Sequence, residues 1–322
     1  MKTNKYNVLL LALGMMVSQL GYAQFYVAVK GGFGTPFVTD DMGTPIELFG
    51  QSDFYLGADG SILNKAIFGT SGGGVQTSVV GGYYFNDNLG INLSATYARS
   101  VSDILDARIN TPTYQGEQTS RNIGVTVTPS LMFSTGNSKK WSASLSAGVI
   151  VPVAGHITSK IKIHDEAGVL IGRLLNAPSA PGIILDLNST VKTSFRPTFG
   201  YTSTLGLQYR FNPNWSIGAD LKIVMLSIVP KESVFEEYAL TDNIDGVDFD
   251  LTESDKHVIY HSELTETDNV KFNTPKTNPY DTSVPNPDFD LTKATDALAF
   301  KQSFNEVIIG FSLYYTFNKN KE

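Results

Sequence analysis

The stretch YTSTLGLQYRFNPNWSIGADLKI, residues 201–223, decides the fold of this chain. On both sides of the tetrapeptide FNPN every second residue is mostly apolar, and the residues between are small or polar. This alternation indicates β-strands with one apolar face. Because Asn caps tight turns with its side chain and tolerates left-handed backbone geometry, FNPN predicts a short reversal between two antiparallel strands.

Related tetrapeptides occur twice more, as FNDN at 85–88 and FNKN at 317–320, and the alternation recurs in eight segments. These segments are 25–33, 75–83, 89–97, 123–133, 141–149, 199–211, 215–223 and 307–317. Each has about the length that a tilted strand needs to cross an outer membrane, and the even number fits a closed ring. The sequence therefore predicts an all-β fold, an eight-stranded antiparallel up-and-down transmembrane β-barrel with long extracellular loops.

Three predicted connections are short and four are long. The short ones are 86–88, 134–140 and 212–214, and the long ones run roughly over 34–74, 100–120, 152–197 and 227–306. In outer-membrane barrels the short turns face the periplasm and the long loops face outward. Since the first connection is long, both termini are expected in the periplasm.

The main alternative is a soluble β-sandwich, whose strands also alternate but bury the apolar face. The polar face here is dominated by Gly, Ser and Thr, whereas a solvated face usually carries many Lys and Glu. Small residues suit the interior of a narrow barrel. Within the strands this face carries four charges, Lys30, Arg210, Asp220 and Lys222. We interpret them as lumen charges, which either pair inside a plugged barrel or line a narrow water path.

Aromatic residues gather beside the short turns and at the end of the last strand. They are Phe85, Phe133, Trp141, Phe211, Trp215, Tyr315 and Phe317. Aromatic rings prefer the boundary between membrane and water, so we expect a girdle of membrane-interface aromatics at the periplasmic rim. Rings that merely close a soluble core are the alternative.

The first 23 residues have the order of a signal peptide. Lys2 and Lys5 precede the apolar VLLLALGMMV (8–17), and the small-residue site GYA precedes Gln24. The expected organisation is a cleaved signal peptide at 1–23 and a barrel at 24–322, with a long extracellular loop at about 227–306. The absence of cysteine excludes a disulfide scaffold and a thiolate metal site.

The signal ending GYAQ, the opening strand QFYVAVKGGFG and the closing strand VIIGFSLYYTF carry a family resemblance. The chain resembles the OmpA/OmpX-like outer-membrane β-barrels of Gram-negative bacteria, a group of small porin-like barrels. The resemblance implies contact with outer-membrane lipid and lipopolysaccharide. It also implies insertion by the barrel-assembly machinery, which reads a terminal aromatic that Phe317 matches, although NKNKE follows it here. No peptidoglycan-binding domain is expected, because the sequence stops at the eighth strand.

The last long connection is strongly acidic. From Lys231 to Glu306 it holds 17 Asp and Glu against six Lys, a formal balance of −11 in a chain of −7. In TDNIDGVDFDLTE (241–253) the weak candidates for a divalent-cation site are Asp242, Asp245, Asp248 and Asp250. With Gly246 at the sixth place of an EF-hand loop, Thr252 stands where the twelfth-place Glu is needed. A solvated acidic loop without metal is the simpler interpretation.

The four histidines all lie in predicted loops, and none suggests catalysis. In HVIYH, extended spacing puts His257 and His261 about 13 Å apart, too far for one metal. Helical spacing would bring them together, but the VIY between them is β-prone. The adjacent His261, Ser262 and Glu263 do not make a triad, because alternate side chains of a strand point to opposite faces. We expect no enzyme activity, no cofactor and no nucleic-acid partner.

Two functions fit these features. The first is a structural or surface-interaction role, in which the large extracellular loops contact a ligand or surface partner. The second is a narrow channel with porin-like transport of small solutes. In that case HITSKIKI (156–163) and ILDLNSTVKTSF (184–195) would widen the barrel to ten strands. Their Lys, His and Asp content instead favours a hairpin that projects above the membrane.

Overall fold

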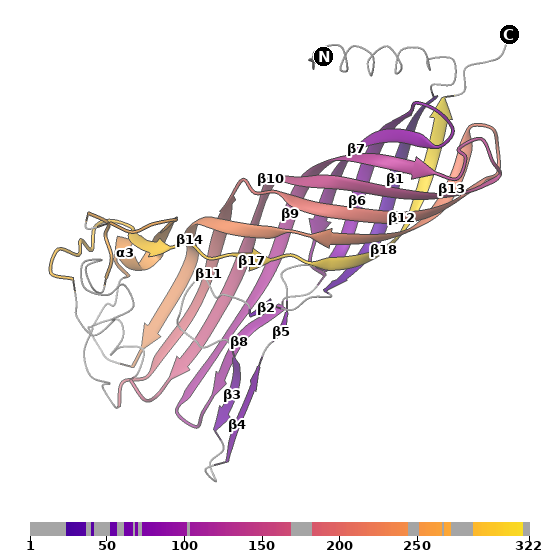
Figure 1. Cartoon of the computed structure of the whole chain (residues 1–322). Coiled ribbons are helices and arrows are strands. Elements are labelled where there is room, and N and C mark those ends of the chain that lie inside the picture. The colour runs from indigo at the N-terminus through magenta and orange to yellow at the C-terminus, as the bar shows by residue number, and fades with distance from the viewer. Residues whose placement is uncertain are drawn as a thin grey trace.

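The computed structural model describes residues 24–36, 40–41, 52–56, 61–66, 68–69, 73–101, 104–168, 182–243, 251–265, 267–271 and 286–317 (Figure 1). The predicted signal peptide lies outside these residues. In the described part of the chain, no helix combines the length and the apolar character that crossing a membrane requires.

Eight of the described strands form a closed antiparallel ring, as predicted. They are β1 (Gln24–Pro36), β6 (Gly74–Tyr84), β7 (Leu89–Arg99), β9 (Tyr114–Ser134), β10 (Trp141–Asp165), β12 (Gly200–Arg210), β13 (Trp215–Met225) and β18 (Glu306–Phe317). Each pairs with the next in this order, and β18 returns to β1 with Phe25 opposite Phe317. The ring therefore has no free edge.

An apolar belt covers the outside of the ring. The outward rows of each strand are the predicted apolar rows, and their side chains are exposed, as with Phe311 (73%), Ile309 (65%) and Phe25 (62%). Monomeric soluble proteins rarely expose apolar patches larger than roughly a few hundred Å². A belt that continues around eight strands is stable only against lipid, so the soluble sandwich is excluded and the ring spans a membrane.

Asparagines build the two shortest turns in the same way. In FNDN the Asn86 Oδ1 accepts the N–H groups of Asn88 (2.9 Å) and Leu89 (2.8 Å), and the Asn88 side chain donates to the Ser134 carbonyl (2.8 Å). In FNPN, Asn212 caps the turn, and the Asn214 side chain donates to the Thr316 carbonyl (2.8 Å). The first Asn thus closes its own turn, and the last Asn ties that turn to a neighbouring strand.

The predicted loops contain far more β-structure than expected. β9 begins at Tyr114 instead of near residue 123, and β10 runs through Pro152 to Asp165. The two strands stay paired beyond the ring, up to Tyr114 opposite Asp165. Pro152 does not end β10, because it lies beside a bulge, where a missing N–H is tolerated.

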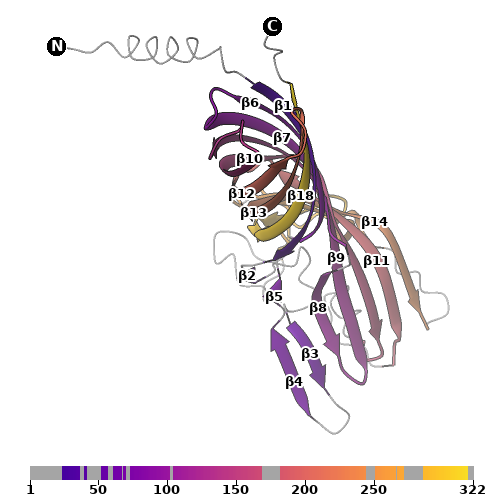
Figure 2. The same cartoon turned by 90° about the vertical axis from the view of Figure 1, so that its right-hand side faces the viewer.

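Further strands widen this extension into an open sheet beyond the ring (Figure 2). They are β3 (Ser52–Leu56), β4 (Ile62–Ala66), β8 (Ile104–Asn110), β11 (Leu185–Arg196), β14 (Ser227–Asp242), β15 (His257–His261) and β16 (Thr295–Leu298). The order across the sheet is β16-β15-β14-β11-β10-β9-β8-β3-β4. β11 pairs with β10 outside the ring, so the predicted projecting hairpin is present and the ten-stranded barrel is wrong.

Smaller elements complete the described chain. β2 (Asp40–Asp41) pairs with β5 (Phe68–Gly69), β17 (Gln302–Ser303) pairs with β14, and the short helix α3 (Glu253–Lys256) precedes β15. One buried apolar cluster packs within the extension, around Ile161, Leu185 and Val191. Two others lie inside the ring, one toward each end, and they determine what the lumen can do.

Candidate functional site: the barrel lumen

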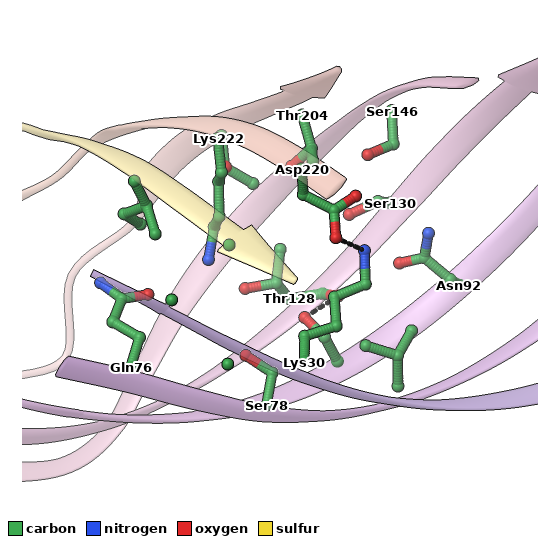
Figure 3. A pocket seen from close by; sticks show the side chains of 17 residues that line it. Lys30, Gln76, Ser78, Asn92, Thr128, Ser130, Ser146, Thr204, Asp220 and Lys222 are labelled. Carbon is green, nitrogen blue, oxygen red and sulfur yellow. Dashed lines mark hydrogen bonds and ion pairs between the residues drawn. The ribbon is translucent and has the colours of Figure 1, made fainter. Parts of the chain in front are cut away.

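The inward faces of the ring strands surround a small polar cavity of about 70 Å³ (Figure 3). Its walls are mostly small residues, among them Ser78, Ser94, Thr128, Ser130, Ser146 and Thr204. A volume of this size holds only a few water molecules. Lys30, Asp220 and Lys222 point into it, so the structure brings together three of the four charges that the alternation placed on the inner face.

Lys30 and Asp220 form an ion pair that bridges two strands that are not neighbours. The Lys30 Nζ lies 3.1 Å from the Asp220 Oδ2, and the Asp220 side chain is only 9% exposed. Lys30 is on β1 and Asp220 on β13, with β18 between them. The β18 residues opposite the pair are Ser312 and Gly310, whose small size leaves room for the two long side chains to meet.

Glu306 is a further lumen charge, although it belongs to the predicted connection 227–306. It is the first residue of β18 and is buried, with its carboxylate accepting hydrogen bonds from the Gln76 side chain and from the backbone N–H of Gly73. Because the outward row begins at Val307, alternation places Glu306 on the inner face. Extending the predicted strand by one residue, from 307 to 306, would have identified Glu306 as a lumen charge.

Arg210 lies apart from the other lumen charges, at the end of β12 beside the short turns. Its guanidinium donates to the backbone carbonyl of Asn137 and, at 3.3 Å, to the Asn137 Oδ1. The Asn137 side chain in turn donates to Gln24 at the start of β1 (2.8 Å). Arg210 therefore ties the 134–140 turn across this rim of the ring.

Buried aromatic side chains close the lumen at the turn end. Tyr26, Tyr84 and Met132 pack together with Tyr314, and the Tyr26 ring lies 5.3 Å from that of Tyr84 and 5.9 Å from that of Tyr314. Both Tyr26 and Tyr84 direct their hydroxyls at the Met132 sulfur. We call this group the tyrosine plug.

Apolar side chains close the opposite end, where the ring meets the extension. The cluster consists of Ile150, Ile157, Val224, Leu226, Ile228 and Ile308, with Phe195 and Phe304 packed against it. We call it the aliphatic plug. A second cavity of about 90 Å³ lies beside it, and Gln76 and Lys222 line both cavities. The lumen thus holds two small cavities, and the second of them lies among the side chains of the aliphatic plug.

The predicted interface aromatics lie at the turn end of the ring, several of them in ring-to-ring contact. Trp141 contacts Tyr209, and Trp215 contacts Tyr315, which also contacts Phe317. Phe85 contacts Tyr83. The side chains of Phe133, Trp141, Phe211 and Phe317 are more than half exposed.

Of the four predicted acidic metal candidates, the described residues include one, so their convergence stays a prediction. Asp242 ends β14, whereas Asp245, Asp248 and Asp250 lie outside the described residues. His257 and His261 stand at the two ends of β15, in the extended conformation that the β-prone VIY predicts. They do not form a two-histidine site.

Comparisons with known proteins reveal no sequence relative. No family profile and no curated protein matches the chain. Among solved structures, OprG of Pseudomonas aeruginosa is similar at 12% identity, with 92% of this chain and 98% of that chain covered and a TM-score of 0.37. A major outer membrane protein of Thermus thermophilus is similar at 13% identity, with 92% of this chain and 99% of that chain covered and a TM-score of 0.36. Neisserial surface protein A is similar at 10% identity, with 90% of this chain and 97% of that chain covered and a TM-score of 0.30.

TM-scores this low carry no argument, so the assignment of the fold rests on the strand pairing. The fold is that of a small outer-membrane β-barrel. The resemblance to OmpA/OmpX-like barrels is thereby confirmed for the fold: an eight-stranded closed ring, an apolar belt, and short turns at one end with long connections at the other.

Proposed function

We propose that this outer-membrane barrel is a non-conducting, non-enzymatic anchor for a surface-exposed β-sheet that contacts a ligand or partner. The observation that carries the proposal is the unbroken passage of β9 and β10 from the ring into the extension. A sheet that continues two membrane strands is held in a fixed orientation, unlike a loop on a flexible tether. Such a scaffold suits the presentation of a contact surface.

A shallow polar groove across β8, β9, β10 and β11 is our candidate for the contact surface. It is lined by Arg108, Gln115, Glu117, Lys162, His164 and Asp186 among others, and has a volume of about 460 Å³. Cross-strand pairing places Lys162 opposite Glu117 on one side and Asn188 on the other. Charges of both signs and several amide donors favour a polar ligand that carries hydroxyl or charged groups.

The proposal includes the orientation expected from the sequence. The extension faces outward, and the short turns and both chain ends face the periplasm. The same proposal has three further parts. The chain is exported by a cleaved signal peptide, the belt contacts lipid and lipopolysaccharide, and the ring is inserted through recognition of Phe317. The aromatic residues at the turn end would then form the periplasmic girdle.

The orientation can be tested directly because the chain contains no cysteine. We expect a membrane-impermeant maleimide to label a Lys162→Cys variant on intact cells. An Asn214→Cys variant, at a short turn, should react only after the outer membrane is permeabilised. Labelling of Asn214→Cys on intact cells, with Lys162→Cys protected, would reverse the orientation and sink the proposal.

The contact role is tested by attachment of bacteria that display the chain, both to each other and to foreign cell surfaces. Replacing Arg108 and Lys162 by Ala should reduce attachment at equal surface expression. The matched control replaces Lys139 and Lys140, two cations of the turn end, and should attach like the wild type. Equal attachment by all three proteins, and by cells without the barrel, would exclude this role.

The narrow channel is the competing function, and the two plugs argue against it. We expect the mature protein, folded into a planar bilayer, to be electrically silent because buried side chains pack together inside the ring toward both of its ends. Reproducible current steps from the wild type would favour transport and would make Lys30, Asp220 and Lys222 candidates for the selectivity of the path.

A further inference from the structure

Three of the four histidines lie close to two carboxylates each, and all three are in the extension. For two of these histidines, the two carboxylates contact opposite nitrogens of the imidazole ring. The His164 Nδ1 lies 2.7 Å from Asp186 and its Nε2 lies 3.2 Å from Glu166. The His257 Nδ1 lies 3.4 Å from Glu253 and its Nε2 lies 3.7 Å from Glu232. Because the two nitrogens of an imidazole point apart, no single ion can join both carboxylates to the ring.

His261 has a different arrangement, in which the acidic groups converge. Its Nε2 lies 2.7 Å from the Asp296 Oδ1. One ligand atom each of His261, Asp268 and Asp296 lies within 4.8 Å of the other two. Ligand atoms of a tetrahedral zinc ion, at bond lengths of about 2 Å, stand roughly 3.3 Å from each other. The three side chains therefore need only small movements to surround one cation.

The backbone holds both carboxylates in place. β15 and β16 are a parallel pair with Ile259 opposite Asp296, which brings Asp296 near the end of β15 at His261. The Asp296 Oδ2 accepts the N–H of Asn269 (2.6 Å), and the Asp268 Oδ2 accepts the N–H of Thr265. One oxygen of each carboxylate is thus oriented by a backbone donor, an arrangement that orders metal ligands.

Asn269, next to Asp268, locks this corner of the chain. Its side chain donates to the carbonyls of Asp290 and Ala294, both at 2.9 Å, and its Oδ1 accepts the N–H of Asp290 (2.8 Å). Its own carbonyl accepts the N–H of Asp296 (3.0 Å). The loop that carries Asp268 and the strand that carries Asp296 are therefore joined by backbone and side-chain bonds without any contribution from an ion.

The charge of the cluster suits a divalent cation. Two carboxylates and a neutral imidazole carry a formal charge of −2, and Asp296 is only 16% exposed. The two lysines that flank the cluster in sequence pair elsewhere, Lys271 with Asp255 at 3.6 Å and Lys293 with Asp290 at 3.0 Å. One nitrogen and two oxygens are a donor set for zinc and related transition metals, whereas calcium prefers oxygen ligands throughout.

We propose that His261, Asp268 and Asp296 bind a divalent transition-metal ion, with Zn²⁺ as the representative ion. Water would complete the coordination of a site with three protein ligands. A bound ion would join Asp268 to the β15–β16 pair.

Zinc binding is best measured on untagged mature protein folded in detergent, by competition with a chromophoric zinc chelator near pH 7.5. The wild type should bind one equivalent. His261→Gln and Asp268→Asn should each weaken binding at least tenfold, which is typical for loss of one ligand of three. The matched control, His164→Gln, removes a histidine whose carboxylates lie on opposite sides of the ring, and should bind like the wild type.

Co²⁺ provides a second readout, since its visible absorption reports coordination by nitrogen and oxygen ligands. The spectrum should appear in the wild type and in His164→Gln, and disappear in His261→Gln. Heat-modifiable gel mobility shows in every case whether the barrel is folded. Folded wild type that fails to bind Zn²⁺ saturably below about 100 μM, or folded His261→Gln that binds as tightly as the wild type, would overturn the assignment.

Discussion

The Lys30–Asp220 pair is the residue-scale feature that most affects the stability of the ring. Both side chains lie in a narrow lumen, where charges are poorly solvated, so each depends on the other. The pair also joins β1 and β13 across β18, the strand that closes the ring. It thus links the first and the last two ring strands from the inside.

Removing one partner should be more harmful than removing both. We expect Asp220→Ala to lower the free energy of unfolding by about 2–4 kcal/mol, because Lys30 is left unpaired in the lumen. The double variant Lys30→Met/Asp220→Leu should lose less than the single variant. Urea unfolding in lipid vesicles, followed by tryptophan fluorescence, measures both. A double variant that is less stable than Asp220→Ala would contradict the argument.

His164 gives the extension a dependence on pH. Hydrogen bonds to Asp186 and then Glu166 raise the pKa of His164 above its ordinary value. The imidazolium therefore favours the folded hairpin. Its contribution is fully present below the unfolded pKa of about 6.5 and is lost as the pH rises through the folded pKa. Since the His164 side chain is 41% exposed, the effect is small and weakens with salt.

Hydrogen exchange tests this dependence with a metal chelator present. After correction for intrinsic rates, the β10–β11 amides near His164 should be better protected at pH 6 than at pH 8. His164→Gln should remove the difference. If the variant keeps the same pH dependence, other groups are responsible.

At the scale of elements, β10 is the strand that leaves the ring and continues into the extension, where it exchanges one neighbouring strand for another. It pairs with β12 up to Ile150 opposite Gly200, and with β11 from His156 opposite Ser194 onward. The bulge between Pro152 and Ala154 and the positive φ of Gly155 (+149°) lie between these two points. An added residue bends a strand and increases its twist, which lets β10 leave the curvature of the ring.

Gly155 and its cross-strand partner Gly124 form a matched pair for mutation. A Cβ on Gly155 would lie 2.6 Å from the Ile123 carbonyl oxygen and would occupy a disfavoured φ, whereas a Cβ on Gly124 meets nothing closer than 4.0 Å. We expect Gly155→Ala to destabilise the extension by about 1–3 kcal/mol. Gly124→Ala should be nearly neutral. Limited proteolysis of the extension compares the two, and equal sensitivity would count against this role of the bulge.

How well each element could be predicted from the sequence depends on what surrounds its two faces. Lipid on the outside and a narrow lumen on the inside enforce strict alternation, so the ring strands could be predicted from the sequence. The cross-strand bonds of Asn88 and Asn214 could not, because they depend on which strand lies beside each turn. The prediction that a connection begins at Pro152 was wrong because β10 continues through a bulge that accommodates proline. The convergence of His261, Asp268 and Asp296 depends on the parallel β15–β16 pairing, which no local pattern indicates.

At the scale of the whole molecule, the two plugs act in series. Current through the lumen would have to pass both the tyrosine plug and the aliphatic plug, so opening one of them is insufficient. The belt, the plugs and the extension together describe a barrel whose interior supports the structure and whose end opposite the short turns carries a further sheet.

This arrangement predicts a non-additive result in planar bilayers. Tyr26→Ala/Tyr84→Ala, which shortens two rings of the tyrosine plug, should remain silent, and so should Ile150→Ala/Ile308→Ala, which shortens two side chains of the aliphatic plug. The fourfold variant should show current steps, provided that it folds, which gel mobility establishes. Conductance in either double variant alone would mean that the other plug is not a barrier.

The pairing of β1 with β18 also constrains how the molecule can be made. Phe25 finds its partner Phe317 only after nearly the whole chain has been synthesised, and this contact has the largest sequence separation in the ring. Closing so long a segment carries an entropic penalty that local contacts do not offset, and topologies of high contact order fold slowly. Until β18 arrives, β1 presents an unpaired edge that can template aggregation. We therefore expect the unfolded chain to need a partner that shields this edge until the ring is complete.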